Sequence, residues 1–326
     1  MLERTEKTKL SIGTDLLIAL LPVVAWSVYL FGARALVLEA LCAAFATLFE
    51  FPVQFFLLGM PPRKCVSGFA ALTGLIVSLL LPVSVPLWIT PIAAAFAVGL
   101  RAIRVYFCHK PFNAAVGSAL VLHLLFPTLM TRYTVPFAYF PAFRITLKAA
   151  MVDHYACLSP MDLLVRGKYY EDGIYAQLYG YASGAIGTVA VLCLLFGFVW
   201  LLLRRTVRLH ASASYVITLL VMSAALAPKQ AAMVNFAWFY VVTGAVPFIA
   251  FLALHDYASA PMRHYGTAMT LFGVLAALLT VLFRSLRLGM AGDYLALLLS
   301  NLATPWLERF TEPKRYYAPP AAPRKR

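Results

Sequence analysis

The sequence is short of charge. Only 12% of its 326 residues are Asp, Glu, Lys or Arg, and the acidic residues number 13. Soluble domains carry about 25% charged residues, so this chain has too little charge to cover the surface of a water-soluble domain. Conversely, 62% of the residues are hydrophobic and the mean hydropathy is +0.82. We therefore expect an integral membrane protein in contact with the lipid bilayer.

The sequence also lacks the usual patterns of metal binding and soluble catalysis. Its five cysteines are scattered, without the C-x-x-C spacing of zinc or redox sites. No P-loop, H-E-x-x-H, G-x-S-x-G or dinucleotide-binding fingerprint is present. We therefore predict no metal site and no catalytic residue, and whether the chain belongs to an enzyme stays open.

The net charge of +14 does not indicate nucleic acid as a partner. Nucleic-acid-binding domains gather their basic residues on one face. Here the basic residues lie between apolar runs, where membrane topology requires them. Nucleic acid is therefore excluded from the expected partners.

Ten apolar runs of about spanning length, separated by Pro, Gly or charged residues, predict ten transmembrane helices. Two of them, the third and the eighth, are short or interrupted, and each holds a Thr-Gly pair, Thr73-Gly74 and Thr243-Gly244. Broken segments in matching positions of two sets of five predict an all-α polytopic fold of two inverted five-helix repeats. The ten runs cover residues 14–32, 35–58, 67–81, 85–106, 111–127, 183–203, 211–227, 233–255, 266–283 and 288–305.

The basic residues indicate the orientation. An even number of spans puts both termini on one side, and with that side in the cytoplasm 18 Lys and Arg lie inside and 9 outside. This bias favours cytoplasmic termini in a multi-pass protein of a bacterial-type inner membrane. The predicted organisation is a first repeat at 1–127, an extracytoplasmic loop at 128–182, a second repeat at 183–309 and a basic cytoplasmic tail at 310–326.

The long outer loop is the first place to look for a functional site, because loops in compact proteins are usually short. It contains Asp153 and, six residues later, Ser159 followed by Pro160. By itself, a Ser before a Pro is typical of a helix start, with Ser159 as the N-cap and Pro160 at the first helical position.

Ionisable residues inside membrane spans are costly and are therefore candidates for function. Glu39 lies five residues after Arg34 near the outer face, which favours an interfacial ion pair. His123 is typical of a hydrogen-bonding partner between helices. Asp256, at the end of the broken eighth span, either caps an unwound segment or belongs to an ion path, and both readings stay open.

Several segments together resemble the NqrB/RnfD family of membrane subunits. The resemblance covers nearly the whole chain, and the length is closer to the D subunits of the family. It implies a membrane subunit of an Rnf/Nqr-type ion-translocating electron transport complex, which moves sodium or protons and contains further subunits as partners. The matching segments are Thr14 to Pro22, Leu72 to Leu75, Leu81-Pro82, Lys110 to Ala115 and Ser300 to Pro305.

The resemblance also implies a cofactor. Family members carry FMN, joined through a phosphoester to a Thr in a stretch like Asp-x-x-Ser-Gly-Ala-Thr-Pro-Leu-Asp and attached by a flavin transferase. Asp153 aligns with the first Asp and Ser159 with the acceptor Thr, and both are expected to serve the flavin. The intervening Ser-Gly-Ala has become Ala156-Cys157-Leu158, which departs from the pattern.

Secondary candidates for the ion path or the flavin environment are Asp256, Thr73, Thr243 and Asn113, the last of which matches the Asn of the family's Pro-Phe-Asn segment. A second, noncovalent flavin is compatible with the resemblance. The alternative is a divergent paralogue without flavin, acting as a scaffold or a transporter-like protein. The altered acceptor stretch is its best support.

Overall fold

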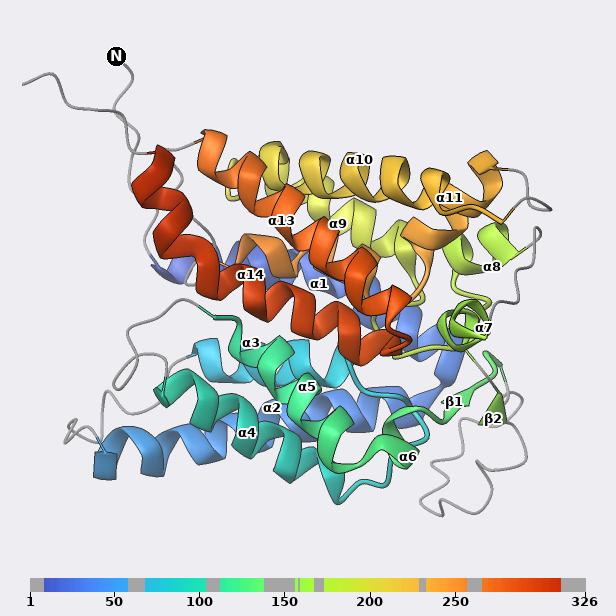
Figure 1. Ribbon diagram of the computed structural model, residues 1–326. Coiled ribbons are helices and arrows are strands. Elements are labelled where there is room, and N and C mark those ends of the chain that lie inside the picture. Colours follow the sequence, from blue (N-terminus) through green and yellow to red (C-terminus); the bar gives the residue numbers. More distant parts are fainter. Residues whose placement is uncertain are drawn as a thin grey trace, which may run out of the picture.

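The computed structural model describes residues 9–57, 68–103, 112–137, 156–157, 159–166, 173–228, 233–256 and 266–311. These residues are helical apart from one pair of very short strands (Figure 1). The first half contains α1 (Lys9–Phe31), α2 (Ala33–Pro52) with a π-helical turn (Val53–Leu57), α3 (Gly68–Leu79), α4 (Ile89–Ile103), α5 (Ala114–Leu125) and α6 (Pro127–Met130). Strands β1 (Tyr133–Thr134) and β2 (Ala156–Cys157) and the short helices α7 (Pro160–Val165) and α8 (Gly173–Tyr179) follow. The second half contains α9 (Val191–Leu203), α10 (Leu209–Ala225), α11 (Met233–Val242), α12 (Val246–Phe251), a 3-10 turn (Ala253–His255), α13 (Gly266–Ser285) and α14 (Gly289–Thr311).

The helices have the apolar character of a multi-pass membrane protein. Three are long and apolar enough to cross a bilayer by themselves, covering Ile12–Phe31, Ala33–Phe56 and Gly266–Ser285. The bent pair Met233–Val242 and Val246–His255 makes a fourth when it is taken as one span. Five further apolar helices, α3, α4, α5, α9 and α10, are shorter. The number of ten spans stays a prediction.

Two helix packings of the first half have counterparts in the second half. In the first half α2 packs against α3 and α4, and in the second half α10 packs against α11 and α13. Between the halves, α1 packs against α9 and α5 packs against α14. Figure 1 shows α10, α13 and α14 above α2, α4 and α5, with the segments from α6 to α8 gathered at the right-hand end. Most of the buried apolar side chains form one continuous core through both halves.

Three glycines lie where helices approach most closely. A Cβ atom on Gly74 of α3 would collide with the backbone carbonyl of Cys42 in α2. One on Gly197 of α9 would collide with the carbonyl of Ala19 in α1. One on Gly273 of α13 would collide with the α10 backbone. Interfaces between membrane helices are enriched in small residues, because these let the backbones approach closely.

The two Thr-Gly pairs occupy different structural positions. Gly244 has a φ of 74° and lies between α11 and α12, which are bent by 69°. Gly74 lies inside the continuous helix α3, which ends five residues later at Leu79. The interruption of the eighth segment at Thr243-Gly244 is therefore confirmed. The third segment is short, as predicted, but Gly74 lies within its helix and allows close packing against α2, so the correspondence of the two Thr-Gly pairs stays a prediction.

Candidate functional site around Ser159

A short strand pairing positions the chain that leads to Ser159. β1 and β2 are antiparallel, with Tyr133 opposite Cys157 and Thr134 opposite Ala156. Ser159 follows β2 by two residues and precedes the first residue of α7. The loop that is predicted to be extracytoplasmic thus returns to the end of the first half before α7 begins; it is called the outer segment below.

Ser159 is the N-cap of α7. Its Oγ accepts a hydrogen bond from the Asp162 amide at 3.1 Å and donates to Asp162 Oδ2 at 2.7 Å. The Ser159 amide donates to the same carboxylate at 3.0 Å, which completes a capping box. Pro160 occupies the first helical position, where its missing N–H costs nothing. The helix-start interpretation of this Ser-Pro pair is therefore confirmed.

The capped serine lies beside the broken helix of the second half. A small cavity is lined by Ser159 and Met161 of the α7 segment, by Val242 and Gly244 at the α11–α12 break, and by Met290 of α14. Its volume is about 20 Å³, which is room for about one water molecule. The outer segment and the break are therefore in direct contact.

A buried ion pair holds the break in place. Arg284 at the end of α13 binds Asp293 of α14 through two parallel bonds of 2.8 Å, from Nε to Oδ1 and from Nη2 to Oδ2. The same guanidinium donates to the carbonyl oxygens of Tyr240 at 2.6 Å and Thr243 at 2.7 Å, and its carbon lies 4.6 Å from the centre of the Tyr240 ring. Asp293 Oδ2 also accepts from the Ala245 amide at 3.1 Å. Arginine and aspartate together satisfy backbone groups that the end of α11 leaves without helical partners.

Thr243 links this break to the outer segment. Its hydroxyl lies 2.7 Å from Gln177 Oε1 of α8 and 2.5 Å from the Phe239 carbonyl of its own helix. Thr243 and Gln177 are both buried. The predicted site residues Ser159 and Thr243 therefore lie on the same small region, one at the cavity and one beside it.

Asn113 and Asp256 meet elsewhere, at the other end of the broken helix. Asn113 caps α5 by accepting from the amides of Ala115 at 3.1 Å and Val116 at 3.2 Å. Its side-chain amide donates to the Ala253 carbonyl at 3.5 Å, and the Asp256 backbone amide donates to the same oxygen at 3.4 Å. The two residues thus adjoin the 3-10 turn that follows α12.

The other candidate residues are Asp153, Thr73 and His123, and the described residues that line the Ser159 cavity include none of them. Asp153 lies outside the described residues. The Thr73 hydroxyl donates to the Phe69 carbonyl at 2.7 Å within α3. His123 was expected to bond between helices, but its Nδ1 lies 2.8 Å from Ala119 O of its own helix, and its ring contacts Tyr294 of α14 edge to face.

Tyr133, just after α6, contacts α14. Its hydroxyl donates to Met290 Sδ at 2.9 Å. Burial raises the pKa of this phenol well above its ordinary value, and the nearby Tyr294, Asp162 and Asp293 raise it further. Tyr133 is therefore stable as the neutral phenol.

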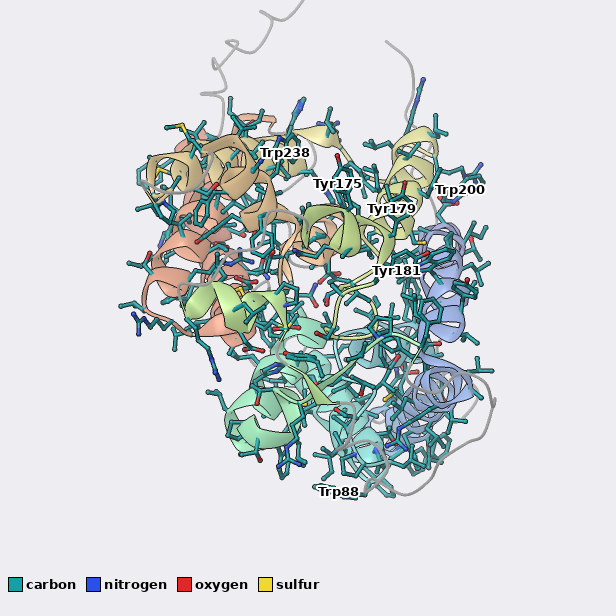
Figure 2. The ribbon with its side chains drawn as sticks, turned by 90° about the vertical axis from the view of Figure 1, so that its right-hand side faces the viewer. Trp88, Tyr175, Tyr179, Tyr181, Trp200 and Trp238 are labelled. Carbon is teal, nitrogen blue, oxygen red and sulfur yellow. The ribbon has the colours of Figure 1, made fainter. Side chains whose placement is uncertain are left out.

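Aromatic side chains gather at the same end of the molecule. Tyr175, Tyr179 and Tyr181 lie on or just after α8 and are at least half exposed (Figure 2). The Trp26 indole of α1 donates to the Tyr179 carbonyl at 2.8 Å. Exposed tyrosine and tryptophan are typical of the membrane–water interface, so this end is expected to meet one surface of the bilayer.

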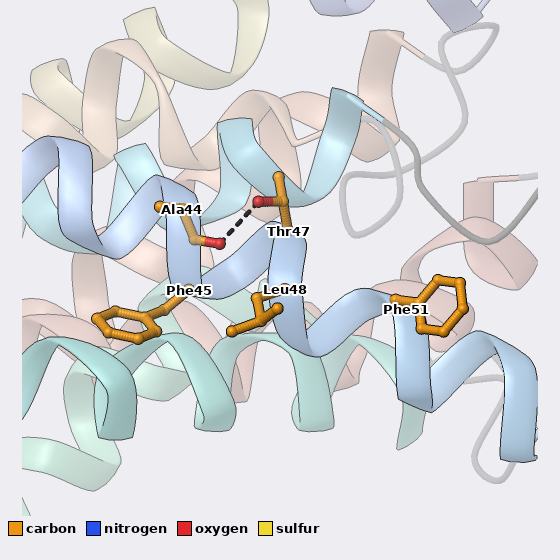
Figure 3. Close-up of a pocket in the computed structure, with 5 residues that line it drawn as sticks. All are labelled: Ala44, Phe45, Thr47, Leu48 and Phe51. Carbon is orange, nitrogen blue, oxygen red and sulfur yellow. Dashed lines mark hydrogen bonds between the residues drawn. The ribbon is translucent and has the colours of Figure 1, made fainter.

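A second, wider hollow lies on the outside of α2. It has a volume of about 460 Å³ and is lined by Ala44, Phe45, Thr47, Leu48 and Phe51 (Figure 3). The Thr47 hydroxyl donates to the Ala44 carbonyl of its own helix at 2.7 Å, so the hollow presents an almost wholly apolar lining. It shares no residue with the Ser159 region and is suited to lipid chains.

The closed α7 does not fit FMN on Ser159. The residue is only 2% exposed, and its hydroxyl is engaged in both directions with Asp162. A cavity with room for one water is far smaller than a flavin. Elsewhere in the described part of the chain, no three His, Cys, Asp or Glu side chains come together as metal ligands.

Comparison with known proteins identifies the family. The model of the NQR2, RnfD, RnfE family matches residues 3–317. The chain belongs to this family. Its curated relatives are named as D subunits of ion-translocating oxidoreductase complexes, in agreement with the sequence resemblance.

Three relatives illustrate the similarity. The D subunit of the Na(+)-translocating ferredoxin:NAD(+) oxidoreductase complex of Acetobacterium woodii is 28% identical, over 96% of this chain and 92% of the relative. The D subunit of the ion-translocating oxidoreductase complex of Stutzerimonas stutzeri is 26% identical, over 92% of this chain and 89% of the relative. The Cronobacter sakazakii protein of the same name is 29% identical, over 92% of each chain.

Proposed function

We propose that this protein is the D-type membrane subunit of an Rnf-like complex that couples electron transfer to the movement of sodium or protons. The family match over residues 3–317, at nearly the full length of the D subunits, carries this proposal. Other subunits of the complex are its expected partners. The chain's own contribution is to hold electron-carrying groups and ion-conducting helices in fixed positions in the membrane.

The proposed architecture is ten spans in two inverted repeats. The packing of α2 with α3 and α4 corresponds to that of α10 with α11 and α13. The pairs α1 with α9 and α5 with α14 join equivalent helices of the two halves. Such like-with-like contacts are expected around a pseudo-twofold axis. Both termini are assigned to the cytoplasm of an inner-membrane protein.

The outer segment distinguishes two forms of this function. In the first, a flavin transferase attaches FMN to Ser159, which requires the α7 cap to be open when the bond forms; a second, noncovalent flavin belongs to this form. In the second form, Ser159 stays an N-cap and the protein is a flavin-free scaffold or transporter-like subunit. The closed capping box and the altered residues 156–158 favour the second form.

In-gel ultraviolet fluorescence separates the two forms. The full chain is expressed together with the flavin transferase of its source, denatured and compared with a Ser159→Ala variant and with a known transferase substrate. Fluorescence in the parent chain that Ser159→Ala abolishes establishes covalent FMN. A dark parent chain beside a fluorescent control substrate rejects covalent FMN, and the protein then acts without it.

A further inference from the structure

Glu39 is a buried acid in the membrane region without a cation beside it among the described residues. It lies on α2 and is 2% exposed, and its Oε2 has no hydrogen-bond partner within the described part of the chain. Arg34 also lies in the described part of the chain, and the predicted ion pair between Arg34 and Glu39 is not formed. The Arg34 guanidinium donates instead to the carbonyl oxygens of Val83 at 2.8 Å and Val85 at 2.9 Å. The other carboxylate oxygen of Glu39 faces Ser27 of α1.

The contacts of Ser27 accommodate a protonated form of this acid. Ser27 Oγ lies 2.7 Å from the Val24 carbonyl oxygen and 2.7 Å from Glu39 Oε1. A hydroxyl has one proton, which Ser27 either shares between these two oxygens or gives to one of them. A protonated Glu39 carboxyl group supplies a second proton, and each of the two contacts then has a proton of its own.

The surrounding charges agree with a neutral acid. The sequence of α3 contains no titratable residue, and the one in α4, Arg101, pairs with Glu50 at 3.5 Å. On α1, Asp15 binds Arg204, and the Tyr29 ring packs against the Trp26 ring. On α2 the nearest titratable neighbour is the Cys42 thiol. An ionised carboxylate in this place would be buried without compensation, which is strongly unfavourable.

We propose that Glu39 is a proton-binding site in the membrane domain, with its protonated carboxyl group donating to Ser27 Oγ and Ser27 donating to the Val24 carbonyl. The site lies near the ends of α1 and α2 that meet the outer segment, because Trp26 beside Ser27 bonds to Tyr179. It takes up or releases a proton at that end of the molecule. The site does not depend on whether Ser159 carries FMN.

Infrared spectroscopy of the purified full chain tests the proposal. Near neutral pH, the parent chain is expected to show the carbonyl stretch of a protonated carboxylic acid, which shifts when the solvent is exchanged for D₂O. Glu39→Gln is expected to remove this band and to fold normally, because a glutamine amide donates to Ser27 as the protonated acid does. Glu308→Gln, at the partly exposed end of α14, is the matched control and should keep the band.

Ser27→Ala provides a second test that does not depend on the folding of the Glu39 variant. Losing the acceptor of the carboxyl proton should move the band to higher frequency without removing it, as for an acid that has lost a hydrogen bond. A parent chain without any band that Glu39→Gln removes would overturn the proposal. So would a band that is present but unchanged in both Glu39→Gln and Ser27→Ala.

Discussion

The buried pair Arg284–Asp293 is the residue-level feature on which the broken helix depends. Asp293→Ala leaves a guanidinium buried at 5% exposure without its counter-ion and frees the Ala245 amide. Breaking one partner of a buried ion pair costs about 3–5 kcal/mol. We therefore expect a large loss of thermal stability in detergent. Unfolding can be monitored by tryptophan fluorescence or by light scattering. Arg287→Gln, at an exposed position nearby, should change stability little; a comparable small change for Asp293→Ala would contradict this role.

The Ser159 cap makes a smaller, local prediction. Ser159→Ala removes the oxygen that accepts the Asp162 amide, and losing an N-cap costs about 1 kcal/mol. Because α7 has only six residues, the effect should be local opening rather than global unfolding. Hydrogen exchange of the α7 amides should become faster. Ser159→Thr keeps both the capping oxygen and a hydroxyl donor, so it should exchange like the parent chain; equal protection in Ser159→Ala would mean that the cap does not hold α7.

At the scale of elements, close helix packing makes the next prediction. Gly197→Ala places a methyl group against the carbonyl of Ala19 and forces α9 away from α1. Overpacking of this kind costs about 1–3 kcal/mol. Gly99→Ala in α4 meets no atom of the described residues within 4 Å, and replacing a mid-helix glycine by alanine gains about 0.5–1 kcal/mol. Thermal denaturation should therefore shift in opposite directions for the two variants, and a shift in the same direction would show that the α1–α9 contact is not tight.

Elements defined by local patterns could be predicted from the sequence, whereas those defined by long-range contacts could not. The apolar runs located the helices, and the Ser159-Pro160 pair located the start of α7, because capping involves neighbouring residues. The two Thr-Gly pairs looked equivalent, yet only Gly244 breaks a helix. The difference depends on Arg284 and Asp293, which bind that backbone from α13 and α14. By sequence alone Arg284 belongs to an outer loop, and no local signal relates it to Thr243.

At the scale of the whole molecule, the candidate site is a meeting point of distant segments. Ser159 of the outer loop, the α11–α12 break and Met290 of α14 line one cavity. The sequence indicates Ser159 and Thr243 as separate candidates, and no pattern in it places them together. Their proximity follows from the packing of α7 against α14 and of α8 against α11. The described part of this loop therefore packs against the helices of the membrane domain. A movement of the broken helix would change the surroundings of Ser159.

The distribution of basic residues predicts how the protein is oriented in the membrane. The bias of 18 basic residues against 9 places both termini and residues 204–208 in the cytoplasm, since positively charged loops are retained there. Alkaline phosphatase, which is active only outside the cytoplasm, should therefore be active when fused after Arg166 and inactive when fused after Arg205. A fluorescent protein that folds in the cytoplasm should fluoresce when fused after Arg326. The reverse pattern would place Ser159 and the aromatic end in the cytoplasm, where an extracytoplasmic flavin transferase could not reach the serine and the proton on Glu39 would exchange with the opposite side of the membrane.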